Sequence, residues 1–396
     1  MIKVGFLINF NTQKWLGGTY VIKNLIYCIN AFSKKEIKPV LIVKKNLSKK
    51  EIKEFKNIKL IKTNFFHNQN LFKKVYYKLL IILFGKSDYY ENFFIKNKIN
   101  VLSHINVMSN SIFLGKNSSI KSLSFIPDFQ HIHYPENFSF KNKLMRNLNI
   151  RMSALHSSKI ILSSFDAKKD LKTISKFAYK KSVVNQVIFK APERKDIVSL
   201  AFLKKKYNIY SKFFYLPNQY WFHKNHIAVL EALKNIKKKH KLKKILVIST
   251  GCNEDHRNKD NFNIIKKFII ENNLQDSYRY IGIIPYKEVL SFMYHSIALI
   301  NPSKFEGRSS TVEQAKSLGK QTILSNINIH KEHNPARRIY FNPDNFLELS
   351  SIMIKIWNNH SYINDKKFAN NKAYKKSKDN LLKYYKNYQK IVTGLL

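Results

Sequence analysis

Apolar and polar residues are arranged along the first half of the chain as short strand-like runs separated by helical spacings. The apolar runs cover residues 3–9, 39–43, 58–61, 101–105, 123–126 and 160–163, and a helical spacing follows the first run over 19–32. Strands that alternate with helices pair in parallel and are covered by those helices. The pattern therefore predicts an α/β structure with a parallel sheet.

The second half repeats this alternation more regularly. Strands are predicted at 213–216, 245–250, 278–281, 297–301 and 322–324, and helices at 226–236, 262–271, 287–295 and 311–318. Such a series of βαβ units predicts a doubly wound, Rossmann-like sheet. A final helix, rich in charged and aromatic residues, is predicted from residue 366 onward.

A length of 396 residues exceeds one ordinary core and suits two α/β domains. The polar stretch at 194–211 is the expected boundary, which gives an N-terminal domain over 1–205 and a C-terminal domain over 206–365. The remainder, 366–396, is expected to pack back on the N-terminal domain.

The formal net charge of +46 comes from 71 Lys and Arg against 25 Asp and Glu, and only eight of the basic residues are Arg. Such an excess attracts polyanions. Three interpretations stay open: a lysine-rich composition typical of an AT-rich genome, attraction to an anionic membrane surface, or nucleic-acid binding. The last is the least favoured, because base readout prefers Arg.

The segment 71–84 is apolar and aromatic with lysines at 73, 74 and 78. It is either a basic amphipathic helix that lies in a membrane interface or an ordinary helix covering the first domain's core. Cys28 and Cys252 are far apart and form no metal or disulfide motif, and residues 1–9 are too short for a signal peptide. A cytoplasmic location, possibly at the inner membrane face, is expected.

The segment Asn301–Ala315 carries the clearest chemistry. A buried strand is predicted to end at Pro302, and a helix to begin near Ser310 after a polar loop. Ligands of doubly wound sheets bind at the carboxyl ends of strands, and a helix N-terminus favours phosphate. Glu306 lies at this crevice, where its carboxylate can accept hydrogen bonds from sugar hydroxyls.

This segment resembles the donor-binding signature of retaining glycosyltransferases with the GT-B fold, particularly glycosyltransferase family 4. That signature is a Glu, seven residues, and a second Glu before an Ala. Glu306 matches the first, and Gln314 occupies the second, which in the family contacts the nucleotide ribose. The resemblance implies two Rossmann-like domains facing across a cleft, and a donor site that includes Gly307, Arg308, Ser309, Ser310 and Thr311.

A second segment, 216–226, resembles the family's first loop of the donor domain, where an Arg and a Lys neutralise the diphosphate. Lys224 matches the Lys and Gln219 stands at the Arg position, so Arg308 is predicted to supply the missing charge. Asn225 and Gly251 are expected to line the same donor site. A surface lysine is the alternative interpretation of Lys224 alone.

The first half offers two fainter matches. Gly17 and Gly18 follow the first strand, where paired glycines let the backbone approach a phosphate or sugar. The segment 125–136 resembles the part of related enzymes that faces the donor sugar, which implies acceptor-side roles for Asp128, Gln130 and His131. Relatives have a His at the position of Pro127, and His131 is the predicted catalytic substitute; a structural histidine is the alternative.

The sequence has no D-x-D pair, zinc-binding motif or P-loop, so no metal or other cofactor is expected. The resemblance implies transfer of a hexose-type sugar from a nucleotide diphosphate to a hydroxyl of a glycan or lipid-linked acceptor, with retention, in cell-surface polysaccharide synthesis. Lys224 and Glu306 would act by positioning and electrostatics. The alternatives are a non-hydrolysing nucleotide-sugar epimerase, or a protein that binds a membrane surface or nucleic acid through its charge.

Overall fold

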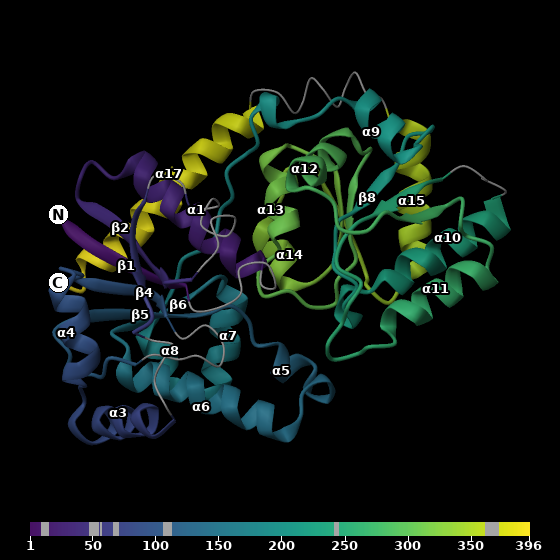
Figure 1. The fold of residues 1–396 in the computed structure, drawn as a ribbon. Coiled ribbons are helices and arrows are strands. Elements are labelled where there is room, and N and C mark those ends of the chain that lie inside the picture. Colours follow the sequence, from purple (N-terminus) through teal and green to yellow (C-terminus); the bar gives the residue numbers. More distant parts are fainter. Residues whose placement is uncertain are drawn as a thin grey trace. The chain divides into compact units, whose positions relative to one another are not determined.

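The computed structural model describes residues 1–8, 16–46, 55, 58–65, 71–105, 113–240, 245–360 and 372–396. The chain forms two compact units (Figure 1). Unit 1 comprises Met1–Ile188 and Asn380–Leu396, and unit 2 comprises Phe189–Asp379. Each unit contains one parallel sheet with helices on its faces, so the predicted α/β class with two Rossmann-like domains is confirmed.

The sheet of unit 1 has the strand order β3-β2-β1-β4-β5-β6-β7. Its strands are β1 (Ile2–Ile8), β2 (Ile37–Lys44), β3 (Lys59–Thr63), β4 (Val101–Ile105), β5 (Lys121–Ile126), β6 (Lys159–Leu162) and β7 (Ser182–Val184). Its helices are α1 (Leu16–Phe32), α3 (Leu71–Phe84), α4 (Asp88–Lys96), α5 (Gln130–His133), α6 (Phe140–His156), α7 (Phe165–Ile174), α8 (Lys176–Lys181) and most of α17 (Lys372–Thr393).

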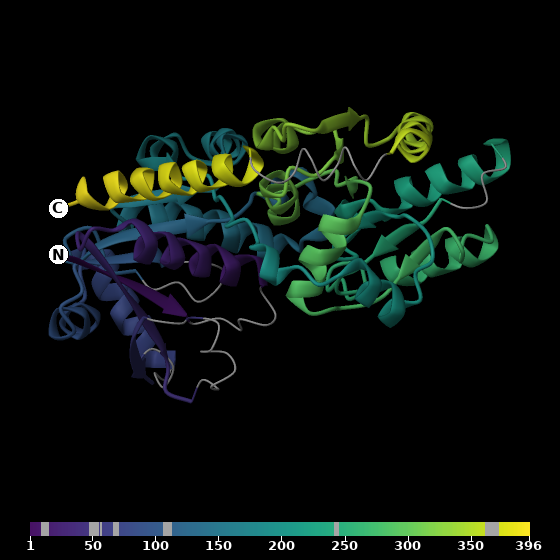
Figure 2. The same cartoon turned by 90° about the horizontal axis from the view of Figure 1, so that it is seen from above.

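Successive residues of the central strands pack alternately into two different hydrophobic cores, one on each face of the sheet. In β1, Phe6 and Ile8 face a cluster that α1 and α17 cover, whereas Leu7 faces a cluster that α3 and α4 cover. Side chains of a strand point to opposite faces in turn, so both faces of a buried parallel strand need apolar residues. Figures 1 and 2 both show α17 beside α1, and the rings of Phe32 and Tyr385 lie 6.1 Å apart between them.

The sheet of unit 2 has the order β10-β9-β8-β11-β12-β13. Its strands are β8 (Phe214–Leu216), β9 (Val247–Ser249), β10 (Tyr278–Tyr280), β11 (Leu299–Asn301), β12 (Thr322–Ser325) and β13 (Arg338–Phe341). Its helices are α9 (Leu200–Tyr207), α10 (His226–His240), α11 (Asn261–Glu271), α12 (Tyr286–His295), α13 (Ser310–Ser317), α14 (Asn328–His333) and α15 (Phe346–Asn359), with a short 3₁₀ helix, η3 (Phe222–Lys224), after β8.

The boundary between the units differs from the expected one at 205/206. Residues from Phe189 belong to unit 2, because α9 and the segment before it pack on α12. Val198 N donates to Ser291 Oγ at 2.9 Å, and Lys206 Nζ lies 2.7 Å from Glu288 Oε1. The final helix is described from Lys372, and the predicted start at 366 lies outside the described residues; from Asn380 onward its residues belong to unit 1 and pack in its core. Within the described part of the chain, no helix has the length and hydropathy needed to cross a bilayer.

Candidate active site

The donor residues predicted in the second half of the chain lie around the point where the strand order of unit 2 reverses. The strands β8 and β11 are neighbours, but the chain leaves them toward opposite edges of the sheet. Such a switch point leaves a crevice at the carboxyl ends of the two strands, where ligands of doubly wound folds bind. Lys224 ends η3 after β8, and Glu306 lies in the loop between β11 and α13.

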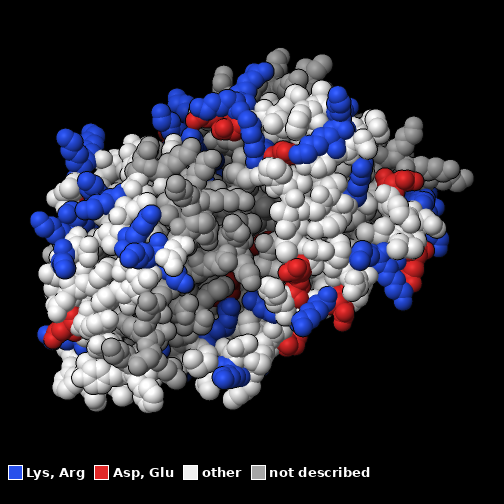
Figure 3. All heavy atoms as spheres, viewed as in Figure 1, with Lys and Arg blue, Asp and Glu red and all other residues white. Residues whose placement is uncertain are grey.

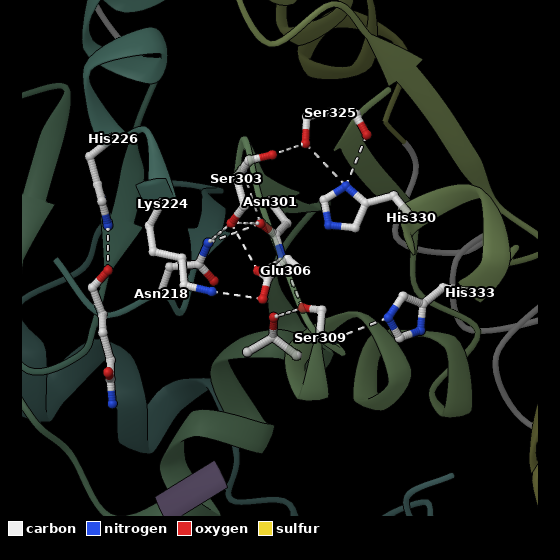
Figure 4. Close-up of polar contacts among 12 residues, drawn as sticks. Asn218, Lys224, His226, Asn301, Ser303, Glu306, Ser309, Ser325, His330 and His333 are labelled. Atoms are coloured by element: carbon white, nitrogen blue, oxygen red, sulfur yellow. Dashed lines mark hydrogen bonds and ion pairs between the residues drawn. The ribbon is translucent and has the colours of Figure 1, made fainter. Parts of the chain in front are cut away.

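Lys224 and Glu306 form an ion pair across this switch point. The Nζ atom of Lys224 lies 2.7 Å from Oε2 of Glu306, and the two side chains are 12% and 7% exposed. An ammonium and a carboxylate that are this deeply buried require each other and further hydrogen bonds, because both have lost their hydration. Figure 4 shows the pair surrounded by polar side chains.

Two buried side chains, Asn301 and Ser303, contact the other carboxylate oxygen, and the buried side chain of Asn218 contacts both of them. Asn301 Nδ2 donates to Glu306 Oε1 at 3.3 Å, and Ser303 Oγ lies 2.9 Å from the same atom (Figure 4). Asn218 Nδ2 in turn donates to Asn301 Oδ1 at 3.0 Å. This network fixes the orientation of the carboxylate.

The electrostatic surroundings keep Glu306 ionised. Burial raises the pKa of this carboxyl, but the neighbouring charge of Lys224, followed by His330 and the hydrogen bond from Lys224, lowers it to about 2. Burial lowers the pKa of His330 to about 4. At neutral pH the site therefore holds an ionised Glu306 carboxylate and a neutral His330 imidazole.

Backbone and side-chain contacts hold the two loops together. Lys304 N donates to the carbonyl of His223 at 2.8 Å. Asn225, in the left-handed conformation with φ 56°, donates through its amide to the carbonyls of Pro302 (3.2 Å) and Pro343 (3.0 Å). The side chain of Asn225 thus connects three loops. This structural role explains the presence of an asparagine here without a contact to the sugar donor.

Gly251 belongs to the same framework. Its φ is +146°, and a Cβ at this position would lie 2.6 Å from the carbonyl oxygen of Asn218. Only glycine permits this approach between the end of β9 and the loop after β8. The contact fixes the start of the segment that leads to Lys224.

The guanidinium group of Arg308 forms ion pairs with two carboxylates. Its Nη2 lies 2.6 Å from Glu313 Oε1, and its Nη1 lies 3.7 Å from Glu332 Oε1. His333 completes the cluster: the N–H of Ser309 donates to its Nε2 at 3.1 Å, so its Nδ1 carries the hydrogen and donates to Glu313 at 2.7 Å. Nε and Nη1 of Arg308 are buried and have no hydrogen-bond partner among the described residues.

The remaining predicted donor residues lie around the start of α13. Ser309 caps the helix, and its Oγ accepts from Asn301 Nδ2 at 3.0 Å, while Ser310 and Thr311 form the first turn and Gly307 lies in the preceding loop. Gln314 Nε2 donates to the hydroxyl of Tyr286 at 2.8 Å. Gln219 has a buried Oε1 that lacks a partner within the described chain, and its carbonyl accepts from His226 Nε2 at 3.1 Å.

The candidates of the first half all lie in unit 1. Gly17 and Gly18 belong to the first turn of α1, and the segment 9–15 that precedes them lies outside the described residues. Asp128 Oδ1 accepts from the N–H of Gln130 at 3.1 Å and lies 3.4 Å from Nη1 of Arg146.

His131 is buried in α5, and its Nε2 lies 2.9 Å from Asn147 Oδ1. Because an amide oxygen can only accept, Nε2 donates and Nδ1 keeps a lone pair, for which the described residues offer no partner. Burial lowers the pKa of His131, which favours the neutral ring, and its Nδ1 can accept a hydrogen bond.

Sequence reasoning missed the partners of the predicted residues. Asn218 and Ser303 lie in the network around Glu306, Glu313 and His333 belong to the cluster of Arg308, and Tyr286 contacts Gln314. Asn301 and Ser303 flank a proline directly after a buried strand, which is a usable signal. Glu313 was visible beside Gln314 in the signature, but its pairing with Arg308 depends on tertiary structure. Among the described residues, no group of three or more His, Cys, Asp or Glu side chains is arranged to hold a metal ion.

Residues 201–375 match the family model described as glycosyl transferases group 1. Among solved structures, a glycosyltransferase from Rickettsia africae is 16% identical with a TM-score of 0.67, covering 100% of this chain and 98% of the other. HepE of Anabaena, solved with UDP-glucose, is 11% identical with a TM-score of 0.68 and full coverage of both chains.

WaaG, a glycosyltransferase involved in lipopolysaccharide biosynthesis, is 11% identical with a TM-score of 0.62, covering 99% of this chain and 100% of the other. A search of curated proteins gives no significant match. The likeness of these structures establishes a GT-B fold.

Proposed function

We propose that this chain, whose residues 201–375 match the glycosyl transferases group 1 model, transfers a sugar from a nucleotide diphosphate to a hydroxyl group of an acceptor. The observation that carries the proposal is the buried Lys224–Glu306 pair at the switch point of unit 2. A carboxylate fixed by Asn301 and Ser303 suits sugar hydroxyls, and an ammonium beside it suits a phosphate. HepE binds UDP-glucose, which supports a nucleotide-sugar donor.

The reaction breaks the bond between the anomeric carbon and the diphosphate oxygen. A bond forms between that carbon and the acceptor oxygen, and the acceptor's proton passes to the leaving diphosphate. Lys224 stabilises the charge that develops on the diphosphate, and the N-terminus of α13 adds partial positive charge. Glu306 holds hydroxyls of the transferred sugar and does not act as a nucleophile.

We further propose that the acceptor enters on the face from which the diphosphate leaves, so that the sugar keeps its anomeric configuration. A hexose donor and a glycan or lipid-linked acceptor of a cell-surface polysaccharide are the expected substrates. The involvement of WaaG in lipopolysaccharide biosynthesis supports this acceptor class. Asp128, Gln130 and His131 are the candidates for contacts on the acceptor side.

Charge stabilisation by Lys224, Arg308 and helix N–H groups is proposed to suffice without a divalent cation. A nucleotide-sugar epimerase is the competing enzyme, because it also binds such donors. It requires an acid–base pair at the sugar, and the ionised, ion-paired Glu306 is poorly suited to give up or take a proton at neutral pH.

A screen of nucleotide sugars tests the proposal. The purified protein is incubated with UDP-, GDP-, ADP- and dTDP-sugars in excess EDTA, and release of nucleoside diphosphate and the configuration of the product are followed by NMR. We expect one donor class to release its nucleoside diphosphate with retained configuration. An epimerised sugar without release would identify the competing enzyme, and loss of turnover in EDTA with recovery in magnesium would disprove metal independence. If no donor is bound or consumed, the proposed function is wrong.

A further inference from the structure

Unit 1 carries two helices whose outward faces are apolar. In α3, Phe72, Tyr76, Leu79 and Leu83 follow one another at intervals of three or four residues, and all four are exposed, Phe72 by 85% and Leu83 by 71%. That spacing places them in one stripe along the helix. Ile81 and Tyr77 attach the other side of α3 to the core of unit 1.

The second helix, α6, repeats this arrangement. Phe140, Leu144 and Leu148 are exposed at intervals of four residues, with Phe140 78% exposed, and Leu155 falls on the same face. The opposite face buries Ile150 and Ala154. An unpaired apolar stripe on one amphipathic helix is unusual for a soluble surface, and two on the same unit indicate a function.

The two helices belong to one side of unit 1. Met152 of α6 packs against the same core cluster that contains Ile81 of α3. Both helices lie along the lower edge of unit 1 in Figure 1, and Figure 3 shows uncharged side chains with some Lys and Arg among the described residues of this edge. We call the exposed faces of α3 and α6 the two-helix surface.

The positive charge of this surface indicates which kind of partner it can bind. Neither α3 nor α6 contains an Asp or Glu, whereas Lys78, Lys141 and Arg151 are exposed on them. A second copy of the chain would bring like charges together, and an apolar protein groove would leave the cations unpaired. A bilayer that contains anionic lipid accepts the apolar side chains among its acyl chains and pairs with the basic side chains that reach the headgroups.

We propose that the two-helix surface binds the interface of an anionic membrane, with α3 and α6 both lying in the plane of the headgroups. The proposal goes beyond the transfer reaction and does not depend on it, because vesicle binding requires neither donor nor acceptor. It does place the chain where a lipid-linked acceptor would be found.

Vesicle flotation with paired variants tests the proposal. One variant carries Phe72→Ser and Leu83→Ser in α3, and another carries Phe140→Ser and Leu148→Ser in α6. The matched control carries Tyr210→Ser and Ile270→Ser in unit 2, where the two side chains are 86% and 63% exposed. All three remove exposed side chains, so circular dichroism should show folded proteins with similar unfolding midpoints.

We expect the wild type and the control to bind vesicles of phosphatidylcholine with phosphatidylglycerol, and to bind phosphatidylcholine alone far less. Each variant of the two-helix surface should bind the anionic vesicles about tenfold more weakly. Added salt should weaken wild-type binding, because the attraction between exposed charges is screened.

Several results would overturn the proposal. Equal binding to neutral and anionic vesicles would remove the role of charge, and unchanged binding by both surface variants would remove the role of the helices. An effect of the α3 variant alone would exclude α6. If the wild type is a dimer without lipid and either surface variant is a monomer, the surface is an interface between two copies.

Discussion

At the scale of single residues, Glu306 tests the site most directly. We expect Glu306→Gln to lower the transfer rate by at least about a hundredfold, because an amide holds sugar hydroxyls and the Lys224 ammonium less strongly than a carboxylate. The measurement is kcat for nucleoside diphosphate release. Asp344→Asn, which disrupts the exposed neighbouring pair with Lys304, is the control and should retain near-normal activity.

Glu306→Ala would be a poor substitute for the Gln variant. It leaves the ammonium of Lys224 buried without its carboxylate, and breaking a buried pair in this way costs about 3 kcal/mol or more. Loss of activity in that variant would therefore combine loss of chemistry with loss of stability. A folded Gln variant that turns over normally would refute the role of Glu306.

Arg308 provides a second prediction at this scale. If its partly unpaired guanidinium binds the donor diphosphate, Arg308→Ala should weaken nucleoside diphosphate binding about tenfold and leave nucleoside binding unchanged. Calorimetric titration with both ligands measures the difference. Installing Arg at position 219 in the Arg308→Ala variant should restore part of the affinity. Unchanged diphosphate affinity would mean that Arg308 serves only the Glu313–His333 cluster.

At the scale of elements, the loops after β8 and β9 depend on Gly251. We expect Gly251→Ala to lower the stability of unit 2 by about 1–3 kcal/mol and to reduce activity, because the new Cβ would push Asn218 and the path to Lys224 aside. Thermal unfolding measures the change in stability, and release of nucleoside diphosphate from the donor measures the change in activity. Gly282→Ala is the matched control: its φ is also positive, +79°, but its Cβ would have no neighbour within 4 Å. Equal losses in both variants would show that backbone strain alone matters.

Much of the element order could be predicted from apolar periodicity. The helix at 71–84 and the start of the helix at His226 agree with the structure, as do the strands from β8 to β12 within a few residues. The pattern gave no strand at β7 or β13 and no helix at α6. The strands β7 and β13 end their sheets and are only partly buried, so they lack the fully apolar run of central strands such as β8 and β11. The exposed apolar face of α6 weakens the contrast on which helix prediction depends.

The candidate site, too, could be predicted only in part from the sequence. Motif spacing placed Lys224 and Glu306 in adjacent loops, because the ends of parallel strands meet at one edge of a sheet. Their direct ion pair, and the burial of Arg308 against Glu313, depend on side-chain directions that no local pattern encodes. The same holds for Asn225, whose three-loop connection gives it a structural role that the sequence did not indicate.

At the scale of the whole molecule, buried histidines make the fold sensitive to acid. Burial lowers the pKa of His104, His223 and His333 to about 3 and that of His226 and His330 to about 4. An unfolded histidine takes up its proton near about pH 6.5, whereas these five do not. The stability that these buried neutral histidines contribute is therefore fully present above that pH. It decreases as the pH falls below it, because the unfolded chain then binds more protons than the folded one.

We expect the thermal unfolding midpoint to fall steadily between about pH 7 and pH 5, before ordinary carboxylates titrate, with each buried histidine contributing about 2 kcal/mol. His330→Asn should reduce this dependence, whereas His256→Asn, at an exposed position, should not. A midpoint that is constant over this range would show that the histidines are accessible to protons in the folded state.

The return of α17 to unit 1 has a consequence for the order in which the protein is made. Unit 2 is continuous in sequence, so all of it leaves the ribosome before residues 380–396 do. The core beneath α1 lacks Leu381, Tyr384, Tyr385 and Tyr388 until then. Unit 2 can thus fold during synthesis, while unit 1 must keep an apolar face uncovered until translation passes these residues. A nascent chain that stalls or is cut within the last turns of α17 would present that face to chaperones and proteases, with unit 2 already folded.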